Sequence, residues 1–177
     1  MAWLLAVHGL LALVLVVGRS RVGRWAFPLA ALAPLAVLVW AGSVAAGVID
    51  GRPVTSSFEW VPALDLAIDF RVDAYSLAFL ALVGVAGVAI FLYSSRYFGS
   101  GPRIATFAGT MVAFAGAMAG LVTADHLIAL FLFWELTTIT SYLHNRYDDR
   151  TAKARSAALH AALNTGGAGL AMHGRMV

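Results

Sequence analysis

Residues 131–143 read FLFWELTTITSYL, an apolar stretch that is interrupted by hydroxyl groups, two polar-tipped aromatic rings and one carboxylate, that of Glu135. The sequence on both sides is typical of a membrane-embedded helix. A charged side chain near the centre of a bilayer costs about 2.5–3.5 kcal/mol on insertion scales, and such residues usually lie on ion pathways or are paired. We therefore expect a functional role for Glu135. A protonated glutamate that only hydrogen-bonds a neighbouring helix is the structural alternative.

The composition predicts an all-α membrane protein that forms a single membrane domain over residues 1–177. The chain is 61% hydrophobic and 12% charged, whereas a soluble domain is about half apolar and about one quarter charged. Cysteine is absent, so disulfides and thiolate metal sites are excluded. The net charge of +3 does not indicate nucleic-acid binding, because the basic residues fall in short loops between apolar segments, where they orient a membrane protein.

Six apolar windows approach the length of about 17–25 residues that a spanning helix needs. They cover residues 2–17, 27–49, 74–93, 104–124, 126–143 and 156–172. The first is a retained span rather than a signal peptide, because its basic residues follow the apolar run instead of preceding it. The sixth is weak and would need neighbouring helices, since it carries His160, Asn164 and several glycines.

The basic residues are distributed unequally between the two sides of a six-span arrangement. One side holds Arg19, Arg21, Arg24, Arg96, Arg103, Arg146, Arg150, Lys153 and Arg155, whereas the loops of the other side hold only Arg52 and Arg71, and Arg175 is in the tail. The side richer in Lys and Arg is normally cytoplasmic. We therefore predict that the N-terminus lies outside the cell.

The longest connection, residues 50–73, lies on the outer side in this arrangement. Leu66, Ile68, Phe70 and Val72 alternate with smaller or charged residues, and this period of two predicts a strand. A short β-hairpin on the outer face is the favoured interpretation, and an irregular polar loop is the alternative.

Few polar side chains lie inside the predicted spans. Glu135 is ten residues beyond the turn at Asp125, roughly 15 Å along a helix and therefore near the midplane. His160 is a candidate proton relay, with packing between helices as an equally good reading. Asn164 and Thr165, one turn deeper, either extend a polar path or hold helices together.

Other polar or small residues have structural explanations. His8 is interpreted as a packing residue, and the hydroxyls that follow Glu135 are expected to bond to their own helix, with water near the carboxylate as the alternative. Gly109, Gly116 and Gly120 would let helices approach closely. The sequence contains no nucleophile paired with a base, no phosphate loop and no metal-ligand spacing, so we predict neither a cofactor nor a metal.

Three motifs together resemble a known family. They are DFRVDAYSLAF (69–79), FLYSSRYF (91–98) and GLVTADHLIALFLFWELTTITSYL (120–143), and DRTAKARSAALHAAL (149–163) continues the likeness. They are similar to the antiporter-like subunits shared by Mrp-type multisubunit Na⁺/H⁺ antiporters and respiratory complex I. FWELT and SSRYF look most like the N-terminal portion of the A-type Mrp subunit.

The resemblance implies that Glu135 translocates protons beside a lysine from a later helix, and it favours a relay role for His160. It implies a bacterial inner (plasma) membrane location, with the lipid bilayer, other antiporter subunits, H⁺ and Na⁺ or another monovalent cation as partners. The alternatives are a proton-pumping, non-redox subunit of an NADH-quinone oxidoreductase or membrane hydrogenase, and a non-transporting remnant.

The chain departs from the family pattern in three ways. Family members are several hundred residues long, whereas this chain stops in the sixth predicted span, before the lysine-bearing helix. It reads SYLHNR (141–146) where the family usually reads SYLLIG, so His144, Asn145 and Arg146 would shorten the apolar helix by about one turn. Its end, LAMHGRMV (170–177), replaces an apolar continuation. We therefore expect a truncated N-terminal part of a longer antiporter-like subunit.

Overall fold

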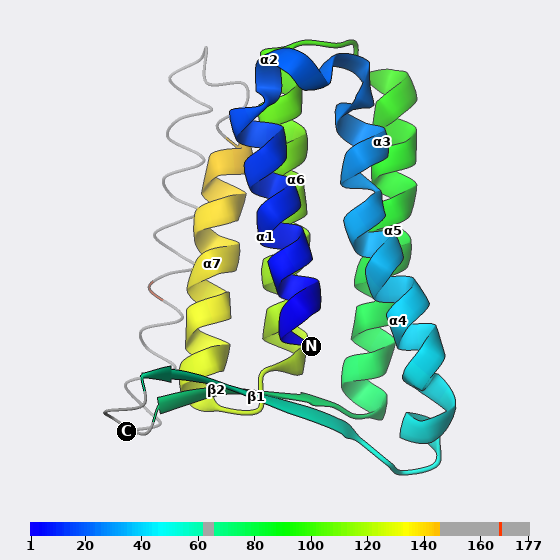
Figure 1. Ribbon diagram of the computed structural model, residues 1–177, viewed down its shortest axis with the longest axis vertical. Helices are drawn as coiled ribbons and strands as arrows, with labels where there is room; N and C mark the ends of the chain where they lie inside the picture. The colour runs from blue at the N-terminus through cyan, green and yellow to red at the C-terminus, as the bar shows by residue number, and fades with distance from the viewer. Residues whose placement is uncertain (62–65, 146–166, 168–177) are drawn as a thin grey trace.

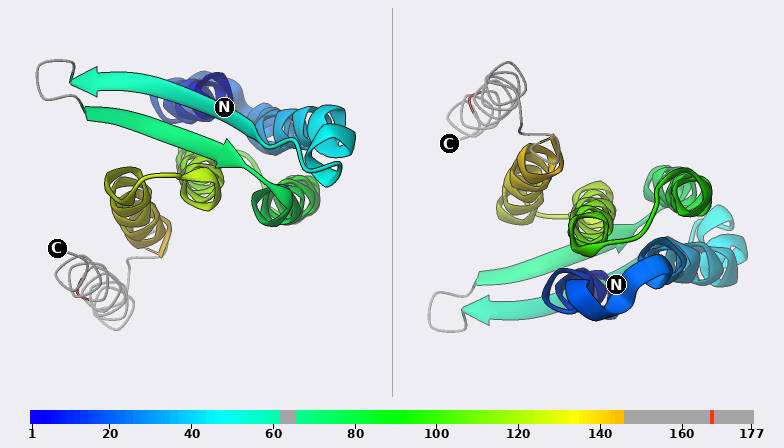
Figure 2. Two further views of the ribbon diagram at one scale, coloured as in Figure 1. Left: turned by 90° about the horizontal axis from the view of Figure 1, so that it is seen from below. Right: turned by 90° about the horizontal axis from the view of Figure 1, so that it is seen from above.

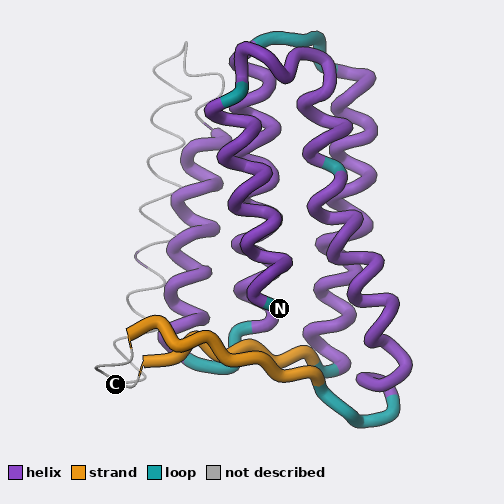
Figure 3. Tube along the Cα trace, viewed as in Figure 1, coloured by secondary structure: helices purple, strands orange, loops and turns teal. Residues whose placement is uncertain are grey.

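The computed structural model describes residues 1–61, 66–145 and 167, as a bundle of roughly parallel and antiparallel helices with a two-stranded sheet across one end (Figures 1 and 3). Four helical segments in this part of the chain are long and apolar enough to cross a membrane: Arg19–Ile49, Ala74–Tyr97, Pro102–Thr123 and Leu127–His144. A shorter apolar helix, Ala2–Val17, stands beside them. The predicted class, an all-α membrane protein with a hairpin, is confirmed. The predicted span 156–172 lies outside the described residues except for Gly167.

The elements follow one another along the chain as helices interrupted by a single hairpin. They are α1 (Ala2–Val17), α2 (Arg19–Val22), η1 (Gly23–Trp25), α3 (Ala26–Ala30), α4 (Leu32–Ile49), β1 (Val54–Val61), β2 (Leu66–Val72), α5 (Ala74–Tyr97), α6 (Pro102–Thr123) and α7 (Leu127–Asn145). In α7 the helix continues through His144 to Asn145, two residues beyond the predicted end.

The second predicted span is divided into α3 and α4 by a turn at Ala31. Pro34 lies three residues after this turn and is buried. A proline has no backbone N–H, so it cannot donate to the carbonyl four residues earlier, here that of Ala30. The missing bond accounts for a break at this position in an otherwise continuous apolar segment.

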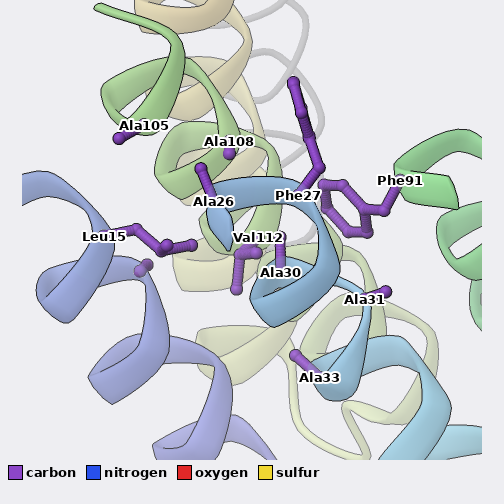
Figure 4. Packing of buried hydrophobic residues seen from close by; sticks show 11 residues of the cluster. Leu15, Ala26, Phe27, Ala30, Ala31, Ala33, Phe91, Ala105, Ala108 and Val112 are labelled. Carbon is purple, nitrogen blue, oxygen red and sulfur yellow. The ribbon is translucent and has the colours of Figure 1, made fainter. Parts of the chain in front are cut away.

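Helix α6 lies at the centre of the bundle, with α1, α5 and α7 around it (Figure 2). Its contact surfaces consist largely of alanine and glycine, and Ala105, Ala108 and Val112 pack against Leu15 of α1 and Phe27 of α3 (Figure 4). Small residues let helix backbones approach closely, which is the main route to association in lipid.

The three glycines of α6 are contact points, as the sequence predicted. A Cβ added at Gly109 would lie 2.8 Å from Val16 Cγ2 and 3.0 Å from the Ala12 carbonyl oxygen, and one at Gly116 would lie 2.7 Å from His8 Cβ. At Gly120 an added Cβ would collide with the ring of Phe133. Because these contacts involve α1 twice and α7 once, the glycines set how closely both helices approach α6.

The outer connection forms the predicted antiparallel hairpin, with Val54 paired to Val72 and Phe58 to Ile68. Phe70 and Val72 turn into the bundle and are 4% and 1% exposed. The hairpin is fastened to the α6–α7 turn: the Asp125 N–H donates to the Asp69 carbonyl at 2.9 Å, and Phe70 pairs with Ala124 in a β-bridge. The hairpin therefore lies against the helix ends rather than projecting into solvent.

Most of the described arginines lie at one end of the bundle and most of the described carboxylates lie at the other. Arg52 and Arg71 are the exceptions among the arginines and lie beside the carboxylates, and Glu135 lies in the interior of α7. Arg19 and Arg21 lie in α2 and Arg24 in η1, while Arg96 and Arg103 lie in the last turn of α5 and the first turn of α6. These elements meet at the end opposite the hairpin (Figure 1). Asp50, Glu59, Asp69, Asp73 and Asp125 all lie in or beside the hairpin or its flanking turns. We call the two ends of the bundle the basic end and the hairpin end.

Replacement of Gly109 by alanine should destabilise the bundle. The new methyl group would enter the contact between α6 and α1, and overpacking of this kind typically costs about 1–3 kcal/mol. Gly42 in α4 is the matched control, because a Cβ there has no neighbour within 4 Å. Thermal unfolding in detergent, followed by circular dichroism, should show a lower midpoint for Gly109→Ala only. Equal midpoints for the two variants would contradict the packing role.

Replacement of Asp73 by alanine should remove a pH-dependent cap. The Asp73 carboxylate accepts a hydrogen bond from the Ser76 N–H at 3.0 Å, and this bond holds the pKa of the carboxyl below its usual value. A lost N-cap typically costs about 1 kcal/mol. Because the folded pKa is lowered, the stabilisation is complete above the unfolded pKa of about 3.9 and disappears as the pH falls through the folded pKa.

The measurement is the difference in unfolding midpoint between wild type and Asp73→Ala as a function of pH. We expect a constant difference near neutral pH that shrinks in acid. A difference of the same size at every pH would show that the charged cap is not its source.

Candidate functional site

Glu135 lies in the middle of α7, a 19-residue helix. The helix begins where the His126 Nδ1 accepts the Ile128 N–H at 3.2 Å and the Leu130 N–H donates to the His126 carbonyl at 2.9 Å. Asp125 and His126 are exposed, in agreement with their predicted position at the end of the span. A regular helix then carries Glu135 away from the hairpin end, into the apolar part of the bundle.

One face of α7 is packed against α6. Ala129, Phe133, Thr137 and Thr140 are buried at spacings of four, four and three residues, and the Phe133 ring occupies the space over Gly120 and lies 5.8 Å from the Phe70 ring. Each residue advances a helix by about 100°. Glu135, two residues after Phe133, is therefore on the opposite side of α7 from α6.

The Glu135 carboxyl group has one oxygen, Oε1, that is buried and makes no hydrogen bond within the described residues. An unsatisfied buried polar group costs about 1–3 kcal/mol. A protein keeps such a group at a cost, so it needs an explanation such as a functional role or a ligand. His8 Nε2, Ser56 Oγ and His144 Nδ1 are also buried without a hydrogen bond among the described residues, but Glu135 is the one carboxyl group in this set and lies in the middle of a spanning helix, which makes it the candidate site.

The threonines beside Glu135 bond to their own helix. Thr137 and Thr138 donate to the Trp134 carbonyl at 2.7 and 3.1 Å, and Thr140 donates to the Leu136 carbonyl at 2.7 Å. Their hydroxyl hydrogens are therefore committed to the backbone, which supports the first of the two sequence interpretations. These hydroxyls are not donors to the carboxylate.

The predicted relay residues cannot be located relative to Glu135. His160, Asn164 and Thr165 lie outside the described residues, so their roles remain predictions. In the part of the chain that is described, every lysine and arginine lies at a helix end or in a connection, and no group of three His, Asp or Glu side chains is placed to hold a metal ion. Glu135 is the single carboxylate in the interior of the described spans.

His8 has the environment of a packing residue, as expected from the sequence. It is 1% exposed, its Nδ1 lies 2.8 Å from the Leu4 carbonyl oxygen, and its side chain fills the space over Gly116. A carbonyl oxygen only accepts hydrogen bonds, so Nδ1 carries the hydrogen.

Sequence reasoning overlooked the position of His144. Its ring stacks on Phe107 of α6 with the centroids 4.5 Å apart, and its Nδ1 is buried with no hydrogen-bond partner among the described residues. The helical spacing from Phe133 and Thr137 would have placed His144 on the α6 face, but the polar run that it begins was interpreted as a helix end.

Comparison with known proteins agrees with the motifs. Residues 59–108 match the protein family described as NADH-Ubiquinone oxidoreductase (complex I), chain 5 N-terminus. A Staphylococcus aureus (strain MRSA252) protein whose name describes an antiporter subunit, mnhA2, is 28% identical over 96% of this chain and 21% of its own length. A Rhizobium meliloti (strain 1021) protein, whose name describes the A/B subunit of a K(+)/H(+) antiporter, is 38% identical over 71% of this chain and 12% of its own length.

The fold of this chain is also similar to that of a solved structure. The Mrp complex from Dietzia sp. DQ12-45-1b contains a chain that matches 96% of this one with a TM-score of 0.71 and 28% sequence identity, over 18% of that chain's length. The chain thus spans about a fifth of the length of the curated relatives that it matches most fully.

The apolar helices and the intramembrane carboxylate define a multi-pass membrane protein. The comparisons confirm the resemblance drawn from the motifs: the chain is similar, over almost all of its length, to A-type subunits of Mrp antiporters, and part of it matches a domain of complex I chain 5.

Proposed function

We propose that this chain is part of a subunit of a multisubunit monovalent cation/proton antiporter in the bacterial cell membrane, and that Glu135 translocates protons. The observation that carries the proposal is the buried Oε1 of Glu135, which has no hydrogen-bond partner among residues 1–61 and 66–145 and lies in the middle of a spanning helix. Two relatives whose names describe antiporter subunits support the choice of transport over enzyme catalysis.

The chemistry of a carboxyl group suits this role. Glu135 binds a proton on a carboxylate oxygen, which removes its charge, and releases the proton to restore the carboxylate. The neutral form is favoured in an apolar environment and the charged form by a nearby cation. Movement of a cation towards Glu135 would therefore drive proton release, and movement of the cation away would drive proton uptake.

The partner of Glu135 is expected on the side of α7 that faces away from α6. The described helices do not pack on that side, because α6 is the helical neighbour of α7 within them. By resemblance to the longer relatives, we expect this partner to be a lysine from a later helix. His160 as a relay, with Asn164 and Thr165 along a polar path, completes the proposed route.

A second function, that of a non-redox membrane subunit of an NADH-quinone oxidoreductase, is favoured by one observation. Residues 59–108 match the N-terminal family of complex I chain 5. Proton movement through Glu135 would then depend on NADH oxidation by other subunits rather than on an added cation. The two functions are therefore distinguished by whether proton movement requires NADH or an added cation.

The basic end is proposed to face the cytoplasm, which places the hairpin end and the N-terminus outside. The chain contains no cysteine, so single cysteines can report the orientation. A membrane-impermeant maleimide should label Ser57→Cys, on the exposed face of the hairpin, in intact cells. It should label Ser20→Cys, in α2, only after permeabilisation. The reverse pattern would refute the proposed orientation.

Replacement of Glu135 by glutamine in the protein that contains this chain should abolish cation-driven proton movement. The amide keeps the shape of the side chain but does not take up a proton near neutral pH. In inverted, respiring vesicles, a pH-sensitive dye should report proton efflux when NaCl or KCl is added to the wild type, and at least a tenfold smaller response for Glu135→Gln.

Glu59→Gln is the matched control, since it removes the same charge from an exposed hairpin position and should leave the response unchanged. Unchanged exchange by Glu135→Gln would refute its role in the relay. If the wild type responds to NADH but not to added cation, the oxidoreductase function is the better description.

A further inference from the structure

Three exposed arginines lie close together in the connection from α1 to α3 at the basic end. Arg19 and Arg21 are in α2 and Arg24 is in η1, and all three side chains are exposed. This connection crosses the end of the bundle instead of projecting away from it (Figure 1), and Val22 packs against the buried cluster beneath. The arginines therefore belong to a packed surface of the bundle.

Aromatic rings behind this connection fix its position. The Phe27 ring, in α3, lies 5.6 Å from the Phe98 ring and 6.3 Å from the Phe107 ring, and the last two rings are 5.5 Å apart. Aromatic pairs at such separations stabilise the contact between the elements that carry them. They bring the last turn of α5, with the exposed Arg96, to the same end as the three arginines.

No carboxylate lies at this end within residues 1–61 and 66–145. Arg19, Arg21 and Arg24 make no ion pair with a described residue. The described carboxylates lie in or beside the hairpin or, in one case, in the interior of α7: Asp50, Glu59, Asp69, Asp73, Asp125 and Glu135. The described residues thus leave the positive charge of this surface uncompensated.

Exposed aromatic side chains indicate the depth of this surface in a membrane. Trp25 is 58% exposed, and the Arg24 guanidinium lies over its ring, 5.6 Å from the centroid. Tyr93 and Tyr97 of α5 stack with their centroids 5.7 Å apart and are 67% and 69% exposed. Trp and Tyr are enriched at the level of lipid headgroups. Rings at that level place the neighbouring arginines among the phosphate groups of the same leaflet.

An anionic lipid headgroup is the occupant that fits this combination of charge and depth. Arginines next to a membrane attract anionic lipids about fivefold per residue, and a guanidinium group can donate two parallel hydrogen bonds to one phosphate. A zwitterionic headgroup also contains a phosphate, but its ammonium group cancels the net attraction. The surface should therefore distinguish the two kinds of lipid.

We propose that Arg19, Arg21, Arg24 and Trp25 form a binding surface for anionic phospholipid headgroups of the leaflet at the basic end. The arginines bind the phosphate groups, and Trp25 lies at the boundary between the headgroups and the acyl chains. This inference depends neither on antiporter activity nor on which side of the membrane the basic end faces.

The test places a fluorophore on Ser20→Cys, between Arg19 and Arg21, in the protein that contains this chain, on a background without other cysteines. The labelled protein is reconstituted in phosphatidylcholine vesicles with a small fraction of spin-labelled phosphatidylglycerol or spin-labelled phosphatidylcholine. Quenching of the fluorophore then reports how much of each lipid is close to it. We expect phosphatidylglycerol to be enriched about fivefold or more over phosphatidylcholine.

Two double variants remove the same charge from opposite ends of the bundle. Arg21→Gln/Arg24→Gln should reduce the enrichment at least fivefold, the factor expected for one arginine near an anionic surface. Arg52→Gln/Arg71→Gln, at exposed positions of the hairpin end, should leave it unchanged. Arg21→Lys/Arg24→Lys keeps the charge and should keep most of the enrichment.

Three outcomes would overturn the proposal. They are equal quenching by the two lipids, unchanged enrichment in Arg21→Gln/Arg24→Gln, and loss of the enrichment when millimolar glycerol 3-phosphate is added, which would indicate a site for a free phosphate ester. A surface covered by an acidic segment of another protein would show equal quenching and would be refuted as a lipid site in the same way.

Discussion

The close approach of helices to α6 is the constraint on which the rest of the described structure depends. In lipid there is little hydrophobic gain from bringing two apolar helices together, so the contact must come from packing. The glycines and alanines of α6 permit that contact with α1 and α7. Once α1 and α7 are packed against α6, the helical repeat determines which faces of these helices remain uncovered.

The position of Glu135 follows from this packing. Phe133 enters the contact surface over Gly120, and the helical repeat then turns Glu135 to the other side of α7. The carboxyl group is consequently separated from α6 and from His8, whose ring belongs to the α1–α6 contact. The two titratable groups in the middle of the bundle are therefore independent features. His8 supports packing, Glu135 does not, and neither the His8 Nε2 nor the Glu135 Oε1 has a hydrogen-bond partner within the described residues.

Much of the fold could be predicted because membranes impose simple rules. Apolar length located the helices, the alternation from Leu66 to Val72 located the second strand, and the distribution of arginine matched the two ends of the bundle. The motifs around Glu135 identified the correct relatives. These signals are local in sequence, and lipid allows few structures other than helices in its interior.

Other features depend on information that periodicity does not contain. The turn at Ala31 reflects the missing N–H of Pro34 three residues later, and the continuation of α7 to Asn145 reflects the stacking of His144 on Phe107. The direction of Glu135 became clear only when Phe133 was seen to face α6. Within the candidate site, Glu135 could be chosen from its cost in lipid, whereas His160, Asn164 and Thr165 are outside the described residues.

The hairpin has a mechanical consequence. It is continuous with α4 at one end and with α5 at the other, and its second strand is bonded to the turn that joins α6 to α7. The ends of four helices are thus linked through one backbone network. A tilt of α7 at that end must therefore move the sheet and, through it, the adjoining ends of α4 and α5.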